Sequence, residues 1–355
     1  MHKAVFVTMS PTPLSRTSSG DLPSHGGDLA GASARFGQPA AGWLDLSTGV
    51  SPFPYPTPAI DPASWQRLPD AGMMAALLRA AAGTYGVPDP GCIVAGAGSQ
   101  AVIRALPRLR PPGRVAVVGP TYAEHAAGWS GAGHRVAMVS DLKGGNGADV
   151  VVVVNPNNPD GRVIRRGDLL AEADRMAASG RLLVVDEAFG DLAPDLSVAP
   201  DIRAGLVVLR SFGKFFGMAG LRLGFGLAEP ALAERLRAEL GPWPVSVPAL
   251  SVGAAALSDQ GWIDETRRRL QEEGRRLDIL LRDAGLCVVG GTDLFRLVED
   301  RDALGLYDHL GRQGILVRPF AQMPRWLRIG LPPGEEGRRR LAQALAARPT
   351  PPGQR

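Results

Sequence analysis

Five short apolar runs recur in the middle of the chain. They cover residues 115–118, 136–139, 150–154, 182–185 and 206–209 and contain only Val, Leu, Ala and Met. Strands that are apolar on both faces are typical of a mainly parallel sheet covered by helices. The runs therefore predict an α/β domain in which ligands bind at the carboxyl ends of the strands.

Helical periodicity surrounds these runs and continues beyond them. It is clearest at 72–85, 231–240 and 262–284, and the last of these segments is long and charged. The remainder alternates short strand-like runs with helical segments, at 287–289, 294–298, 303–312, 315–317, 326–329 and 335–347. This second pattern predicts a small α+β domain that follows the large one.

Changes in composition suggest the domain boundaries. We expect a large domain at 59–260 and a small C-terminal domain at 261–348. Residues 23–58 pass through Gly and Pro without periodicity, which indicates an N-terminal arm that contributes to the small domain and to the active site. The Pro-rich ends, 1–22 and 349–355, predict disordered tails.

The composition of the 355 residues favours a protein with a large hydrophobic core and argues against a nucleic-acid-binding or membrane protein. A hydrophobic content of 45% is ample for a large core, and the formal net charge of +4 comes mostly from scattered arginines. Arginine clusters at 267–269 and 338–340 lie in helical segments, so solvated helix faces are favoured over nucleic-acid binding. No apolar run is long enough to span a bilayer, and 1–22 lacks a hydrophobic signal core, so we expect a cytoplasmic protein without membrane attachment.

The chain has two cysteines, Cys92 and Cys287. They lie far apart and lack the spacing of metal ligands, so we predict neither a metal site nor a disulfide framework. Buried thiols in a reducing compartment are expected.

One lysine lies in an unusual chemical setting, within 209–224. Lys214 is surrounded by small and apolar residues, with Ser211 three positions before it and Arg222 eight positions after it. An apolar environment disfavours the ammonium form, so the amine can attack an aldehyde, while hydroxyl and guanidinium groups suit phosphate oxygens. We interpret Lys214 as a Schiff-base lysine for pyridoxal phosphate, although a glycine-flanked lysine taken alone is more often a surface residue.

Further polar residues follow the apolar runs. Tyr122 follows the first run, Asn158 the third, Asp186 the fourth and Ser211 the fifth. A glycine-rich turn at 98–100 opens a helix, whose free N–H groups and positive dipole end would bind phosphate. We expect these residues to meet at one edge of the sheet.

Three segments in this order, 155–161, 184–189 and 209–224, resemble the aspartate-aminotransferase superfamily of fold type I pyridoxal-phosphate enzymes. The resemblance extends over nearly the whole chain. It implies a transferase-like α/β fold with a mainly parallel seven-stranded sheet, pyridoxal 5'-phosphate as the cofactor, an amino-acid substrate and a homodimer.

Pyridoxal chemistry assigns roles to the candidate residues. The pyridine nitrogen must stay protonated, so a buried carboxylate belongs beside it, and Asp186 is the candidate. Asn158 would hydrogen-bond the phenolic oxygen and reach the substrate, and Tyr122 would stack on the ring. Taken singly, Asp186 is more often a capping or salt-bridged acid and Tyr122 more often a core aromatic. The expected catalytic residues are Lys214, Asp186 and Tyr122, and the expected phosphate ligands are Gly98, Ser99, Gln100, Ser211 and Arg222.

The substrate carboxylate of this superfamily is typically bound by a C-terminal arginine, and Arg328 matches that position. Arg318 and Arg325 are alternatives. The segment 47–50, which contains Gly49, would help to orient this carboxylate, and His25 would bind a substrate phosphate. By itself, His25 is more readily explained as an exposed loop histidine.

Four stretches resemble the threonine-phosphate decarboxylases of cobalamin biosynthesis more closely, namely 25–28, 44–49, 98–101 with 106–109, and 120–125. This resemblance implies decarboxylation of L-threonine O-3-phosphate. Phe189 and Leu68 stand where histidinol-phosphate aminotransferases usually have tyrosines, which agrees with the decarboxylase. Transamination of the histidinol-phosphate type is the alternative activity, and a cofactor-binding protein without catalysis is a third possibility.

Overall fold

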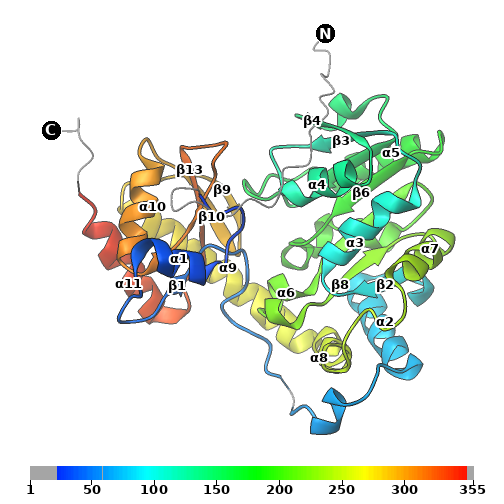
Figure 1. Ribbon diagram of the computed structural model, residues 1–355, viewed down its shortest axis with the longest axis horizontal. Coiled ribbons are helices and arrows are strands. Elements are labelled where there is room, and N and C mark those ends of the chain that lie inside the picture. The colour runs from blue at the N-terminus through cyan, green and yellow to red at the C-terminus, as the bar shows by residue number, and fades with distance from the viewer. Residues whose placement is uncertain (1–21, 58, 350–355) are drawn as a thin grey trace. The chain divides into compact units, whose positions relative to one another are not determined.

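The computed structural model describes residues 22–57 and 59–349, which divide into two compact units. The first unit comprises Pro54–Glu265, and the second combines the described residues up to Phe53 with those from Thr266 onward. Helix α9 (Gln260–Asp283) begins in the first unit and continues in the second (Figure 1).

The first unit is built on a seven-stranded sheet with the order β2-β8-β7-β6-β5-β3-β4 (Figure 1). Neighbours from β4 to β7 pair in parallel, whereas β8 pairs antiparallel with both β7 and β2. The strands are β2 (Ile93–Gly96), β3 (Arg114–Val118), β4 (Arg135–Val139), β5 (Val150–Val154), β6 (Leu182–Asp186), β7 (Leu206–Ser211) and β8 (Gly224–Leu227). The predicted α/β fold and mainly parallel sheet are confirmed.

Helices cover this sheet. They are α2 (Ala71–Tyr85), α3 (Ser99–Ala105), α4 (Ala123–Gly131), α5 (Arg166–Ala177), α6 (Phe212–Phe215), α7 (Pro230–Leu240) and α8 (Val247–Ser258). Alternate residues of β3, β5, β6 and β7 form one core with side chains of α3, α4 and α7, among them Val102, Trp129 and Leu236. This packing fixes the helix N-termini that follow the strands.

In the first unit, strands β2 and β8 and helices α6 and α8 were not predicted from the sequence. Strand β8 contains Gly224 and Gly226, which weaken a strand signal. Glycine is required there because a Cβ at Gly226 would lie 2.8 Å from Val102 of α3, and one at Gly224 would collide with the backbone nitrogen of Ser99. Strand β2 lies within a stretch that we interpreted only as a turn before a helix, and the apolar sequence of α8 has no clear periodicity.

The second unit contains a four-stranded antiparallel sheet with the order β12-β13-β10-β9. A two-stranded parallel sheet joins β1 to β11 through the pairs Leu44–Ile315 and Asp45–Leu316. The elements are α1 (Leu29–Phe36), β1 (Leu44–Asp45), β9 (Cys287–Thr292), β10 (Phe295–Glu299), α10 (Ala303–Arg312), β11 (Ile315–Leu316), β12 (Arg318–Pro319), β13 (Trp326–Gly330) and α11 (Gly334–Ala346). Leu44 and Asp45, near the N-terminus, are thus paired with the C-terminal part of the chain.

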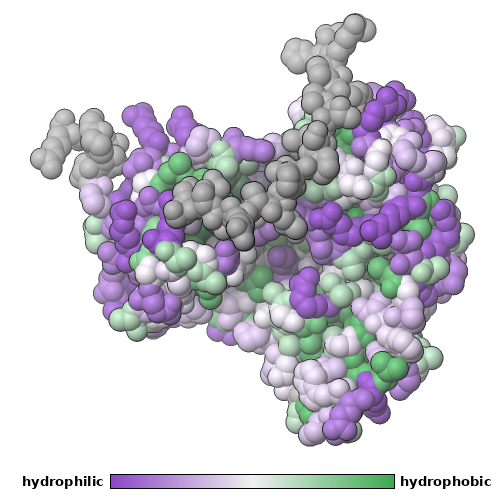
Figure 2. All heavy atoms as spheres, in the orientation of Figure 1, coloured by the Kyte–Doolittle hydropathy of each residue, from purple (hydrophilic) through white to green (hydrophobic). Residues whose placement is uncertain are grey.

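The exposed surface is mixed in character, and the two cysteines differ in burial. Hydrophilic and hydrophobic side chains are interspersed on the face shown in Figure 2. Within 22–57 and 59–349, no helix is both long and apolar enough to cross a bilayer. Cys92 is buried as expected, but Cys287 is exposed because it begins the edge strand β9, so its predicted burial was wrong.

Candidate active site

A pocket in the first unit lies where β5, β6 and β7 end, with Val154, Asp186 and Ser211 in its wall. It brings together all nine residues that the sequence suggested for the cofactor. These are Gly98, Ser99, Gln100, Tyr122, Asn158, Asp186, Ser211, Lys214 and Arg222. The wall is completed by Val154, Ala188, Phe189, Gly213, Ala219 and Leu223. The three strand ends thus meet as parallel topology requires.

Asp186 is the last residue of β6, and only 2% of it is exposed. Its Oδ2 lies 2.7 Å from Nε2 of the buried His125, and its Oδ1 accepts a hydrogen bond of 2.9 Å from the N–H of Ala188. A buried carboxylate that is held in this way suits a protonated ring nitrogen.

His125 was not assigned a role from the sequence. It lies in the first turn of α4, three residues after Tyr122, and the two ring centroids are 6.1 Å apart. Residues three apart on a helix share a face. Once Tyr122 was placed after the apolar run 115–118, His125 could therefore have been recognised as its neighbour. His125 touches Asp186 and not the pocket, so we interpret it as a positioning residue.

Tyr122 precedes the first residue of α4 and is partly buried in the pocket wall. Its hydroxyl donates to Oε1 of Gln100 at 3.4 Å. Burial, followed by the charges of Glu124 and Asp186, raises the pKa of Tyr122 to about 12. The side chain is therefore a neutral phenol with its ring available for stacking.

Three segments converge where a phosphate would bind. Gly98 has a φ of +81° and precedes α3, so the N–H groups of Ser99 and Gln100 open this helix. A Cβ at Gly98 would lie 2.7 Å from Nη2 of Arg222. Arg222 itself has a left-handed backbone and donates through Nη1 to the carbonyl of Ala219 at 3.2 Å. The guanidinium is thus held over the glycine turn.

Lys214 and Asn158 complete the pocket. Lys214 lies in α6 between Phe212 and Phe215, both of which are fully buried. The loop of Asn158 is fixed by its neighbour Asn157, which accepts a hydrogen bond from the Thr121 hydroxyl at 2.6 Å.

This donor set fits pyridoxal phosphate. It offers an amine for the aldehyde, a buried carboxylate for the ring nitrogen, an aromatic ring, and a guanidinium with hydroxyl and N–H groups for the phosphate. Glycine at 98 lets the Arg222 guanidinium approach the turn, because a side chain there would collide with it.

Apart from Asn158, the residues suggested for the substrate lie in the second unit, where His25 is exposed and Gly49 is buried. Arg328 of β13 is 7% exposed and donates through Nη2 to the carbonyl of Ser47 at 2.8 Å. Burial, together with the nearby charge of Arg318, lowers the pKa of Arg328 to about 10. Arg328 therefore contacts the segment that contains Gly49.

The N-terminal arm is also fixed within this unit. The N–H of Gly27 donates to Oγ of Ser47 at 2.7 Å, and this hydroxyl in turn donates to Oδ1 of Asp45 at 2.5 Å. Arg318 donates to the carbonyls of Pro23 and Ser24. His25 is therefore flanked by anchored residues.

The chain belongs to the class I and II aminotransferase family, whose sequence profile matches residues 59–345. It is 46% identical over 327 residues to a threonine-phosphate decarboxylase from Pseudomonas aeruginosa, covering 90% of this chain and 96% of that protein. It is 47% identical over 335 residues to a threonine-phosphate decarboxylase from a Sinorhizobium species, covering 91% and 97%. The protein is a pyridoxal-phosphate enzyme.

Solved structures share the fold. Histidinol-phosphate aminotransferase from Sinorhizobium meliloti, in complex with pyridoxal 5'-phosphate, gives a TM-score of 0.75 at 24% identity, covering 89% of this chain and 92% of that one. L-threonine-O-3-phosphate decarboxylase from Porphyromonas gingivalis gives 0.72 at 22% identity, covering 85% and 98%. At these identities the likeness concerns the fold alone.

Proposed function

We propose that the protein decarboxylates L-threonine O-3-phosphate to (R)-1-amino-2-propanol O-2-phosphate and CO2, as a cytoplasmic homodimer in cobalamin biosynthesis. The observation that carries the proposal is the identity of 46–47% to two threonine-phosphate decarboxylases over nearly their whole length. The pocket supports it because it gathers an amine, a buried carboxylate and phosphate-binding groups.

The proposed roles in the pocket follow from the position of each group. The bound cofactor supplies an electron sink for the bond that is broken. Asp186 would hold a proton at the ring nitrogen, and Tyr122 would stack on the ring; both residues line the pocket. Lys214 or a water would deliver a proton to the substrate α-carbon once CO2 has left. Asn158 bonds the phenolic oxygen of the cofactor and contacts the substrate.

Substrate orientation decides which bond breaks. The bound cofactor would withdraw electrons from whichever bond the protein orients for cleavage, so decarboxylation would need the carboxylate to be held for cleavage and transamination the α-hydrogen. We assign the carboxylate to Arg328 and the segment around Gly49, and the substrate phosphate to His25 with neighbouring N–H groups. The contact between Arg328 and the Ser47 carbonyl supports a shared role for these groups.

The test is to supply L-threonine O-3-phosphate to the cofactor-loaded protein, with and without 2-oxoglutarate. We expect CO2 and aminopropanol phosphate in both cases and no glutamate. Glutamate without CO2 would replace the proposal with an aminotransferase of the histidinol-phosphate type. The control is Lys214→Ala, which should abolish turnover and change the visible absorbance of the bound cofactor.

A homodimer is proposed from the family resemblance and is tested separately. Trp65 and Leu68 are 69% and 63% exposed, and both lie in the first unit just before α2. Large apolar side chains in such positions agree with a protein contact. Light scattering should give twice the mass of 37.3 kDa, and a monomer at micromolar concentration would contradict the proposal.

A further inference from the structure

A buried ionic cluster lies next in sequence to the pocket residues of β6 and β7. Glu187 follows Asp186, and Arg210 precedes Ser211. Nη1 of Arg210 lies 2.9 Å from Oε2 of Glu187, and Nη2 contacts Asp191. None of these three charged residues lines the pocket. In β7, Arg210 points away from the side of Ser211, because successive side chains of a strand point to opposite sides.

The cluster is enclosed. Glu187, Asp191 and Arg210 are 1%, 5% and 3% exposed. The guanidinium lies 4.3 Å from the ring centroid of Tyr85. A Cβ at Gly190 would collide with Nη1 of Arg210, so the chain between the two acids must carry a glycine to pass the arginine.

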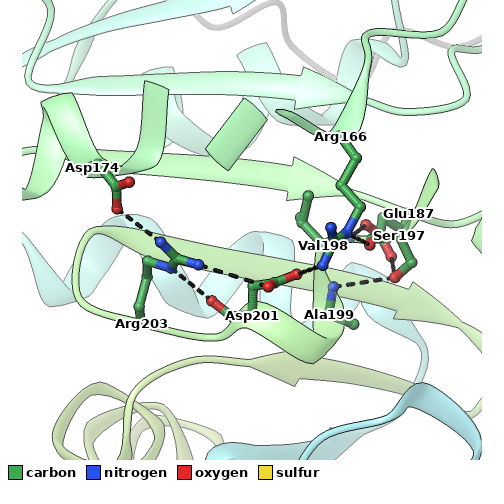
Figure 3. Close-up of polar contacts among 8 residues, drawn as sticks. All are labelled: Arg166, Asp174, Glu187, Ser197, Val198, Ala199, Asp201 and Arg203. Atoms are coloured by element: carbon green, nitrogen blue, oxygen red, sulfur yellow. Dashed lines mark hydrogen bonds and ion pairs between the residues drawn. The ribbon is translucent and has the colours of Figure 1, made fainter. Parts of the chain in front are cut away.

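Glu187 also fixes the segment that follows it. Its Oε2 accepts a hydrogen bond of 2.5 Å from the Ser197 hydroxyl, and its Oε1 accepts one of 2.7 Å from the N–H of Val198 (Figure 3). The backbone N–H of Glu187 donates to the carbonyl of Leu209 at 2.9 Å, which ties β6 to β7. One side chain therefore connects two strand ends with the loop that carries Phe189 of the pocket wall.

The charges of this cluster are costly. Burial raises the pKa of Glu187, although Arg210 and the Ser197 and Val198 hydrogen bonds act in the opposite direction. Burial also opposes the charge of Arg210, but Asp191 and Glu187 outweigh it and raise its pKa above the ordinary value. Apolar residues of similar volume often replace such a cluster without loss of stability. Stability alone therefore does not explain its presence.

We propose that Glu187, Asp191 and Arg210 form an ionic clamp that positions Asp186 and Ser211 for the cofactor. The clamp residues touch neither the cofactor site nor the substrate, so they are positioning residues. Their effect is geometric, because a shift of about 1 Å in a reacting group is enough to reduce a rate by about 100-fold. The inference concerns cofactor binding and does not depend on the identity of the substrate.

The test removes the charges while retaining the volume, in the triple variant Glu187→Gln, Asp191→Asn and Arg210→Met. A glutamine at 187 keeps an oxygen for the N–H of Val198, and no buried charge is left alone. We expect release of pyridoxal phosphate from the full-length holoenzyme to become about tenfold faster, with an altered visible spectrum. The Tm of the cofactor-free chain should stay within about 3 °C of the wild type.

The control is a second ion pair on the same segment, Arg166 with Asp201, whose side chains are 42% and 21% exposed (Figure 3). The double variant Arg166→Met and Asp201→Asn removes an anchor of 197–201 but leaves the clamp intact. It should release the cofactor at the wild-type rate. Equal effects of the two variants, or a wild-type release rate in the triple variant, would overturn the proposal.

A conservative variant covers the case in which the triple variant does not fold. Arg210→Lys keeps the charge but cannot bridge two carboxylates with a planar fork. We expect it to fold and to release the cofactor several-fold faster than the wild type. A release rate and spectrum identical to the wild type would show that bridging by Arg210 does not position the pocket.

Discussion

Replacing His125 with Phe removes the hydrogen bond that holds the Asp186 carboxylate. Both side chains are nearly fully buried, with 1% and 3% of their surface exposed. Phe is similar in shape and keeps an edge-to-face contact with Tyr122, but it has no donor for Oδ2 of Asp186. The change therefore isolates the contribution of one hydrogen bond.

The expected loss of stability in His125→Phe follows from the burial of His125 and Asp186 and from the charge of the carboxylate. A hydrogen bond to a charged group contributes about 1.5–3 kcal/mol. Because the carboxylate keeps the N–H of Ala188 as a donor, we expect the free energy of unfolding to fall by about 2 kcal/mol. Binding of pyridoxal phosphate should weaken about tenfold, since a displaced carboxylate forms a poorer ion pair with the ring nitrogen.

Urea unfolding of the cofactor-free chain and a cofactor titration followed by absorbance would measure both effects. His134→Phe is the matched control, because His134 is also buried in the first unit and bonds the Pro107 carbonyl at 3.0 Å without lining the pocket. It should lose stability but keep cofactor affinity. The reasoning fails if His125→Phe leaves the cofactor affinity unchanged, or if its stability changes by less than about 0.5 kcal/mol.

Further predictions concern the glycine turn and Tyr122. Gly98→Ala should cost about 1–2 kcal/mol of stability and weaken cofactor binding, because it strains a positive φ and pushes against Arg222. Gly83→Ala, in open space within α2, should instead stabilise the chain by about 0.5–1 kcal/mol, and both changes are measured by urea unfolding. Since the pKa of Tyr122 is raised to about 12, its stabilisation is present below pH 10 and is lost as the pH rises through 12. Between pH 9.5 and 11.5 the free energy of unfolding of the wild type should fall by about 1–2 kcal/mol more than that of Tyr122→Phe, after allowance for solvent screening. Equal losses in the two proteins would contradict the raised pKa of Tyr122.

The parallel part of the fold was predictable because its strands are buried on both faces. Val150–Val154 consists of five valines, a run that strongly predicts a buried strand. Strand β8 escaped prediction because α3 packs so closely against it that glycine is needed at 224 and 226. Its identity as a strand depends on a helix more than 100 residues away, which local sequence does not reveal.

The pocket was predictable for a related reason. Polar residues within a few positions of the end of an apolar run lie at one edge of a parallel sheet, and this rule found Tyr122, Asn158, Asp186 and Ser211. The same rule does not distinguish residues that face the pocket from those that face away. Glu187 therefore went without a role, although it lies beside Asp186 in the chain.

Phe189 lies in the chain between the clamp residues Glu187 and Asp191 and also lines the pocket. It lines the pocket and is 3% exposed, so a phenylalanine there contributes an apolar wall and no hydrogen bond to the cofactor. In the proposed binding mode, the phenolic oxygen of the cofactor would be left to Asn158, and placement of the cofactor would depend more on Asp186. A chain that lacks the tyrosine hydroxyl thus gains more from a rigid support of Asp186. We therefore expect Phe189→Tyr to reduce the effect of the triple clamp variant on cofactor release, and strictly additive effects would contradict this coupling.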